Sequence, residues 1–346
     1  MAKRKKKSRP VQQPAPVPVK KSLPIGWIVF AVLAVLAAVI TLWIILASGG
    51  QGSGSETTAP VISEGPAPTV DTSKSVTMRI VKAGSAYVEP DENASTVFSF
   101  RKGDHVDVVS SEGGWSTIAV EGRPYYIPTS SLRAVDEYLI VIDAGHQLRE
   151  DSGKEAITPG GAETAIRMEA GHTGVVTGQQ EYDLTLAVSL KLQAALEARG
   201  YKVVMIRNHN AVNVSNVERA QVANKLYADA YISLHASSSD DADKRGIYTI
   251  CQATDNSFNG SLYAQSKALA TDILDATVKT TGAPKLDRKE TNDLSGINWC
   301  EIPLAFVELG HLSCADEDRL LSTDEYRQKL ANGIADGIDA FFTVEE

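Results

Sequence analysis

The sequence predicts an α/β domain with a mostly parallel sheet flanked by helices, preceded by a small all-β barrel and one transmembrane helix. Three observations predict this order. An uncharged apolar run occupies residues 25–47, short β-like runs separated by glycines occupy 76–134, and apolar runs alternate with helical patterns over 137–343. The chain has 346 residues, a length that suggests about two domains.

Charge is distributed unevenly between the start of the chain and the rest. Residues 1–24 hold eight Lys or Arg and no acid, although the formal net charge of the whole chain is −9. Residues 25–47 hold no charge, and about 20 apolar residues are enough for a helix to cross a bilayer. A cleaved signal peptide has a shorter apolar region and a small-residue cleavage site, so the pattern favours an uncleaved anchor.

This charge order predicts the topology of the chain. Positive residues stay on the cytoplasmic side, so residues 1–24 are predicted to be a basic cytoplasmic tail of a single-pass plasma-membrane protein. The membrane is therefore an expected partner, and contact with anionic lipid explains the basic tail better than nucleic acid, which we do not expect as a partner. Residues 48–75 are rich in Gly, Ser, Thr and Pro and predict a flexible linker.

Residues 76–134 have the pattern of a small all-β unit. The β-like runs are 76–81, 96–100, 105–110, 115–120 and 123–127. Short strands at this spacing predict a barrel. The order of Lys102-Gly103-Asp104 and Gly114-Trp115 resembles a bacterial SH3-like domain. Such modules commonly bind cell wall, so the resemblance implies wall binding, with a plain spacer module as the alternative.

From residue 137 onwards the period of the sequence changes. Continuous apolar runs occupy 138–142, 201–206, 230–234, 247–250 and 304–309. Helical patterns occupy 183–199, 217–227, 262–279 and 324–342. Strands that are apolar on both faces are typical of sheets covered on both sides, and their alternation with helices predicts a largely parallel sheet. Such sheets place functional sites at the carboxyl ends of their strands.

Four side chains in this region form a chemical pattern. His146 and His235 follow the first and third apolar runs, Glu308 lies late in the last run, and Glu181 opens a helix. Each alone has an ordinary explanation, such as a glutamate that suits the dipole of a helix. Together, two histidines and one carboxylate predict a catalytic zinc set with one position left for water. A separate acid nearby can take the proton of that water.

Four segments in order resemble the zinc-type N-acetylmuramoyl-L-alanine amidases of the Amidase_3 family. They are 141–146 (VIDAGH), 181–186 (EYDLTL), 218–236, which ends in SLHA, and 303–310 (PLAFVELG). The resemblance implies that residues 137–343 are an amidase catalytic domain. It also implies that His146, Glu181 and His235 bind zinc (Zn2+), with Glu308 as the general base and later the general acid.

The resemblance implies a cell-wall hydrolase. The family cuts the amide between N-acetylmuramic acid and L-alanine, so the expected substrate is peptidoglycan, and the catalytic domain is expected outside the membrane, facing the cell wall. A catalytically silent wall-binding or scaffold protein is one alternative. Another zinc hydrolase acting on wall peptides is a second, although the sequence has no His-Glu-x-x-His motif. The need for a protein activator as a partner stays open.

The chain departs from the family pattern in more than one place. Gln147 stands where a glycine often follows the first histidine, and an insert of residues 147–178, which contains His172, precedes Glu181. Loops longer than about 12–15 residues are often functional, so we predict that the insert shapes the substrate groove or caps the zinc, with a long surface loop as the alternative. His311 stands where the family usually has a phenylalanine, and it is expected behind the site or at the surface, with a substrate contact as the alternative.

The three cysteines do not indicate a disulfide framework. Cys251, Cys300 and Cys314 are odd in number and widely spaced. We expect small buried residues, with a bond between Cys300 and Cys314 as the alternative.

Overall fold

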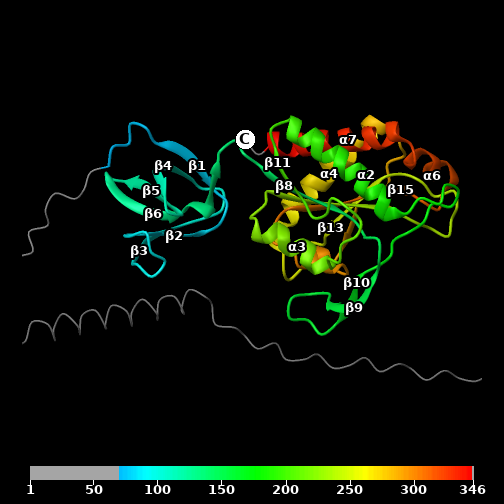
Figure 1. The fold of residues 1–346 in the computed structure, drawn as a ribbon, viewed down its shortest axis with the longest axis horizontal. Coiled ribbons are helices and arrows are strands. Elements are labelled where there is room, and N and C mark those ends of the chain that lie inside the picture. Colours follow the sequence, from blue (N-terminus) through cyan, green and yellow to red (C-terminus); the bar gives the residue numbers. More distant parts are fainter. Residues whose placement is uncertain (1–69, 345–346) are drawn as a thin grey trace, which may run out of the picture. The chain divides into compact units, whose positions relative to one another are not determined.

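The computed structural model describes residues 70–344 (Figure 1). The predicted cytoplasmic tail (1–24), the predicted transmembrane helix (25–47) and most of the predicted linker (48–75) lie outside the described residues. Between residues 70 and 344, no helix combines the length and the apolar character needed to span a bilayer. The prediction of a plasma-membrane location is corrected to this extent: the long helices between residues 70 and 344 carry charged side chains among their apolar ones.

Residues 76–134 form one antiparallel sheet of seven strands in the order β3-β2-β6-β5-β4-β1-β7. The strands are β1 (Val76–Ile80), β2 (Gly84–Tyr87), β3 (Thr96–Phe100), β4 (His105–Glu112), β5 (Trp115–Val120), β6 (Arg123–Pro128) and β7 (Leu132–Ala134). The sheet surrounds its own apolar core, which includes Ile80, Phe100, Ile118 and Ile127. All five predicted runs are strands, and the structure adds the short strands β2 and β7.

The second sheet has six strands in the order β11-β8-β12-β15-β13-β14. Its strands are β8 (Leu139–Ala144), β11 (Lys202–Met205), β12 (Ala230–Ser237), β13 (Tyr248–Gln252), β14 (Lys289–Thr291) and β15 (Leu304–His311). β11, β8, β12 and β15 are parallel to one another, as predicted. β13 runs antiparallel to β15, and β14 pairs parallel with β13.

The prediction of a mostly parallel sheet is therefore corrected to a mixed sheet. Parallel neighbours need a crossover connection, usually a helix. The chain between β12 and β13 contains no helix, so β13 returns in the opposite direction.

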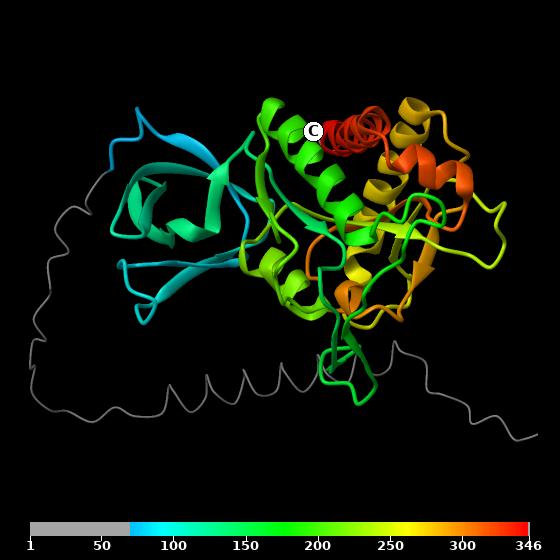
Figure 2. The same cartoon turned by 45° about the vertical axis from the view of Figure 1, so that its right-hand side comes forward.

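Helices cover both faces of this sheet (Figures 1 and 2). They are α2 (Glu181–Ala198), α3 (Asn216–Lys225), α4 (Tyr263–Thr281), α5 (Ser295–Asn298), α6 (Ala315–Leu321) and α7 (Asp324–Val344). α2, α4 and α7 pack together on one face, and α3 lies on the other. The apolar strands and the inner helix faces form one continuous core. Cys251, Cys300 and Cys314 are buried free thiols, so the alternative Cys300–Cys314 bond does not form.

The insert between β8 and α2 is ordered. It contains a hairpin of β9 (Asp151–Ala156) and β10 (Thr164–Met168), which pair antiparallel in a sheet of their own. The hairpin projects from the edge of the domain at which β8 ends (Figures 1 and 2). Residues 151–168 of the insert, for which a long surface loop was the alternative, are therefore an ordered hairpin.

Candidate active site

His146 lies two residues after β8 in an unusual backbone conformation. Its φ is 61°, a left-handed value that few residues other than glycine adopt. Its Nδ1 lies 2.9 Å from the carbonyl oxygen of Glu169. A carbonyl only accepts hydrogen bonds, so Nδ1 carries a proton, and in the neutral ring Nε2 presents a free lone pair.

His235 comes from β12, the next strand of the sheet. The parallel register pairs His235 with Glu308 on β15, which places both side chains on the same side of the sheet. The Nδ1 atom of His235 lies 3.2 Å from Nε2 of His146. Gly145 makes this approach possible, because a Cβ atom there would lie 2.5 Å from the His235 ring.

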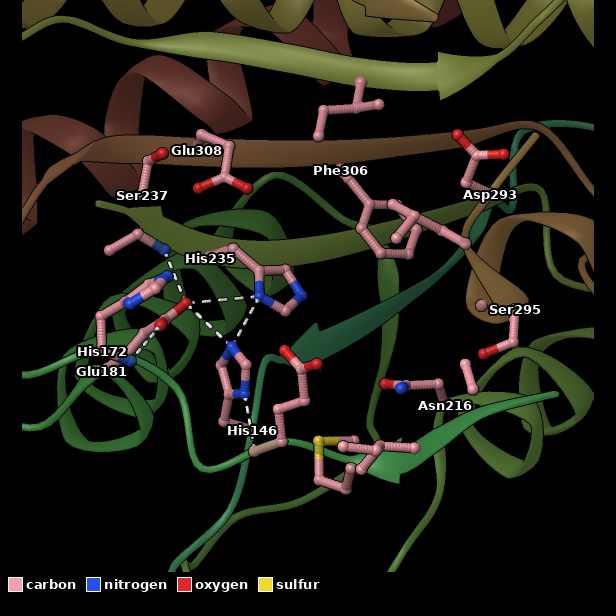
Figure 3. Close-up of a pocket in the computed structure, with 18 residues that line it drawn as sticks. His146, His172, Glu181, Asn216, His235, Ser237, Asp293, Ser295, Phe306 and Glu308 are labelled. Atoms are coloured by element: carbon pink, nitrogen blue, oxygen red, sulfur yellow. Dashed lines mark hydrogen bonds and ion pairs between the residues drawn. The ribbon is translucent and has the colours of Figure 1, made fainter. Parts of the chain in front are cut away.

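Glu181, the first residue of α2, completes a compact cluster (Figure 3). Its Oε1 lies 3.0 Å from His146 Nε2 and 3.4 Å from His235 Nδ1. Backbone amides hold the carboxylate in place, since Ala236 N–H donates to Oε1 and His172 N–H donates to Oε2. The three ligand atoms lie within 4.8 Å of one another, so these residues can hold a metal ion.

The charges of this cluster depend on one another. Burial alone raises the pKa of Glu181, but hydrogen bonds from His146 and His235 outweigh burial and hold that pKa far below its ordinary value. Burial lowers the pKa of His235, yet the Glu181 carboxylate outweighs it and raises that pKa above the ordinary value. Glu181 is therefore an anion at neutral pH, which is the state that a cation requires.

Glu308 lies beside this cluster on β15 and is not part of it. Its Oε2 is buried and has no hydrogen-bond partner among residues 70–344. Burial raises the pKa of Glu308, and the nearby His235 only partly offsets this effect. A carboxylate with a raised pKa and a free acceptor atom is suited to take up and release a proton.

These four residues open into one cavity of about 270 Å³. Figure 3 shows Glu308 and Ser237 at one end and Asp293, Ser295 and Asn216 at the other. Apolar side chains also line the cavity, namely Ala165, Ile166, Met168, Ala236, Ile250, Leu294 and Phe306. Three of these, Ala165, Ile166 and Met168, belong to β10, so the insert forms one wall of the cavity.

The hairpin is fixed to the opposite wall of the cavity through β9. The carboxylate of Glu155 accepts a hydrogen bond of 2.8 Å from the Ser295 hydroxyl and lies 3.3 Å from the Val217 amide at the start of α3. The indole N–H of Trp299 donates to the carbonyl oxygen of Ala156. The two walls are thus joined directly to each other at this end.

The second limb of the insert, which is the segment that follows the hairpin, is attached to α6. Asp318 is fully buried and accepts hydrogen bonds from the amides of Val176 and Thr177, the Thr177 hydroxyl and the Gln179 amide group. This limb carries His172, which lines the cavity.

The structure thus brings all four predicted residues together and places His311 elsewhere. His311 is buried, its amide donates to Glu317, and it is not among the residues that line the cavity.

Sequence reasoning missed Asp143, Ser233 and Arg219, which lie behind the histidines, and also Glu155 and Asp318. The first three fall inside the segments that carry the family resemblance, and that position was the only signal.

Two histidines and two carboxylates gather at the carboxyl edge of the parallel strands of a mixed sheet, an arrangement typical of metal-dependent hydrolases. Residues 140–340 match the Amidase_3 family, described as N-acetylmuramoyl-L-alanine amidase, and the chain belongs to this family.

Individual relatives agree with this assignment. The N-acetylmuramoyl-L-alanine amidase Rv3717 of Mycobacterium tuberculosis is 30% identical over 215 residues, which cover 60% of this chain and 87% of that protein. The probable cell wall amidase LytH of Staphylococcus aureus is 25% identical over 263 residues, covering 73% of this chain and 80% of that protein. The crystal structure of the amidase Ami1 from Mycobacterium smegmatis superposes with a TM-score of 0.55 at 26% identity, over 60% of this chain and 97% of that one.

Proposed function

We propose that this chain is a zinc-dependent N-acetylmuramoyl-L-alanine amidase that hydrolyses the amide bond between N-acetylmuramic acid and L-alanine in peptidoglycan. The observation that carries the proposal is the cluster of His146, Glu181 and His235, with Glu308 beside it, in a domain of the amidase family.

The donor set fits zinc. Catalytic zinc sites commonly use three protein ligands from histidine and carboxylate and leave a further position open. Metal-binding histidines usually donate their other ring N–H to an oxygen. His146 does so to the Glu169 carbonyl, and the distal nitrogen of His235 lies 3.1 Å from the Ser233 hydroxyl. We propose His146, Glu181 and His235 as the zinc ligands.

The protein groups then perform the proton transfers. When bound, zinc polarises the amide carbonyl and acidifies water. Glu308 takes a proton from the attacking water on its free Oε2 and delivers it to the leaving nitrogen of L-alanine. The raised pKa of Glu308 favours the second step, because the acid form persists long enough to protonate the amine. The walls from β10 and residues 293–296 hold the substrate beside this carboxylate.

The test uses the full chain, purified peptidoglycan and the Glu308→Gln variant as a matched control. Mass spectrometry should detect intact stem peptides with a new free L-alanine amine, and a chelator or the E308Q change should abolish their release. Release of sugar fragments or of internal peptide fragments would contradict the assigned bond. A zinc-loaded protein that releases nothing would show that a further factor, such as a protein activator, is needed.

We further propose that residues 76–134 are an SH3-like module that holds the enzyme on the wall. Trp115 and Tyr126 line a hollow of about 510 Å³ on this unit. The Tyr87 ring packs edge-on against the Trp115 ring, with 5.4 Å between the ring centroids. Such rings supply large rigid contact surfaces. Trp115→Ala should reduce cosedimentation with peptidoglycan while hydrolysis of a small soluble muropeptide is unchanged. Equal cosedimentation of both proteins would favour the spacer alternative.

A further inference from the structure

A buried ion pair lies behind the two histidines. Asp143 is the fifth residue of β8 and Arg219 lies in α3, and their Oδ1 and Nη1 atoms are 2.7 Å apart. Both side chains are at least 96% buried, with exposures of 4% and 1%. Burial alone raises the pKa of Asp143, but the Arg219 guanidinium and further hydrogen bonds outweigh it and lower that pKa. Asp143 is therefore a fixed anion in the interior.

The second oxygen of Asp143 sets the direction of a chain of hydrogen bonds to His235. Asp143 Oδ2 accepts from the Ser233 hydroxyl at 2.9 Å and from the Tyr231 hydroxyl at 2.7 Å. A serine hydroxyl has one proton, so Ser233 Oγ can only accept from its next partner. That partner is Nε2 of His235 at 3.1 Å.

This direction fixes which ring nitrogen of His235 is protonated. With the proton on Nε2, the lone pair of Nδ1 faces His146 Nε2 and Glu181 Oε1. The His146 ring is set the opposite way, with its proton on Nδ1 and its lone pair on Nε2. The two rings thus present lone pairs to the same point in space from opposite tautomers.

Arg219 extends the same ion pair to the other histidine. Its Nη2 donates to the carbonyl oxygen of His146 at 3.0 Å, and its Nη1 donates to that of Ala144 at 2.8 Å. These bonds hold the backbone on both sides of Gly145, where His146 adopts its left-handed φ of 61°. Such a conformation persists only where surrounding groups hold it.

We propose that Ser233 and Asp143 are positioning residues that hold His235 in its metal-binding tautomer, and that Arg219 holds the backbone of His146. This inference rests on the proposed function, in which both histidines bind zinc. A merely structural role is the competing explanation, since all three side chains are buried and stabilise the junction of β8, β12 and α3.

Tyr231 offers a matched control for Ser233. Both hydroxyls donate to the same oxygen of Asp143 and both residues are fully buried on β12, but only Ser233 contacts His235. Ser233→Ala and Tyr231→Phe therefore remove equivalent hydrogen bonds from the ion pair. Only S233A removes the acceptor of the His235 Nε2 proton.

The first arm of the test needs no variant. Ring ¹⁵N shifts of histidine-labelled, metal-free full chain, recorded at a pH where both rings are neutral, should show His235 protonated at Nε2 and His146 at Nδ1. A His235 ring protonated at Nδ1 would overturn the inference whether or not zinc binds.

The second arm measures zinc affinity by competition with a chelating indicator. S233A should bind zinc about 10–100-fold more weakly than the wild type, and Y231F should keep the wild-type affinity. Equal affinity of S233A and the wild type, or equal losses in S233A and Y231F, would overturn the inference. A wild-type chain that binds no zinc would instead refute the proposed function, which separates the two failures.

Discussion

Glu155 gives the sharpest test of how the insert forms a wall. In the wild type its carboxylate accepts from the Ser295 hydroxyl at 2.8 Å and lies against the first turn of α3. Glu155→Ala removes both contacts and leaves the bonds from Trp299 to Ala156 and from Asn298 to Ile157 in place. The hairpin should then separate from α3 and α5 more often without losing its own strand pairing.

The size of the effect follows from these contacts. A hydrogen bond to a charged group contributes about 1.5–3 kcal/mol, and a carboxylate at a helix N-terminus adds about 0.3–1 kcal/mol. Glu155 is only partly buried, so solvent screening reduces the total to about 1–2 kcal/mol. At 1.36 kcal/mol for each factor of ten, the population of the separated hairpin should rise about 5–30-fold.

Amide hydrogen exchange measures this population directly. The amides of β9 and β10 should exchange faster by that factor in E155A, while those of β8 and β12 stay unchanged. Glu163→Ala is the control, because it removes an exposed carboxylate from the same hairpin. Activity is a weaker measure, since it falls only as far as the docked population falls. Equal hairpin protection in E155A and the wild type would refute the idea that Glu155 joins the two walls.

Three further predictions concern the site and its supports. Glu308→Gln should lower kcat by about 10²–10⁴-fold and leave zinc affinity intact; a matching loss of zinc affinity would contradict its role as a base. Glu181 raises the pKa of His235 above its ordinary value of about 6.5, so a proton competes with the metal for this ring. Zinc affinity should therefore rise with pH and become constant only once the pH exceeds this raised pKa. Affinity that does not vary between about pH 5 and 9 would contradict this. Asp318→Asn should cost about 1–3 kcal/mol in the free energy of unfolding at neutral pH, measured with denaturant. Burial raises the pKa of Asp318, but bonds from Thr177 and Gln179 outweigh it and lower that pKa, so this stability is present above about pH 4 and is lost below it. A difference between D318N and the wild type that persists unchanged at about pH 3 would argue against the carboxylate.

The main strands were predictable because burial on both faces leaves a continuous apolar run. The runs at 138–142, 230–234 and 304–309 correspond to β8, β12 and β15, which form the centre of the sheet. The edge strand β14 and the hairpin strands β9 and β10 were not predicted. Their sequences KET, DSGKEA and TAIRM are short or largely polar, so neither period nor apolar length marks them. The direction of β13 depends on a tertiary pairing that no local pattern encodes.

The candidate site divides in the same way. The residues that face the cavity have chemically distinctive side chains at strand ends and helix starts, so both their position and the family resemblance drew attention to them. Ser233 in a strand and Arg219 in a helix have ordinary local explanations, and their function depends on which groups lie within 3.2 Å in the folded chain. Glu155 and Asp318 lie 140 and 141 residues from Ser295 and Thr177, their respective partners. No spacing rule connects residues so far apart in the chain.

The buried pair of Asp143 and Arg219 is hard to explain by stability alone. Replacing a buried ion pair with apolar residues of similar volume is often neutral or even stabilising. The left-handed backbone of His146 adds a cost of about 1–3 kcal/mol. Apolar side chains could fill the same space, but they could neither accept a hydrogen bond from Ser233 nor donate one to the carbonyl of His146. The arrangement is therefore better explained by what it does to the two histidines, whose lone pairs must meet at one point although the residues come from different segments of the chain.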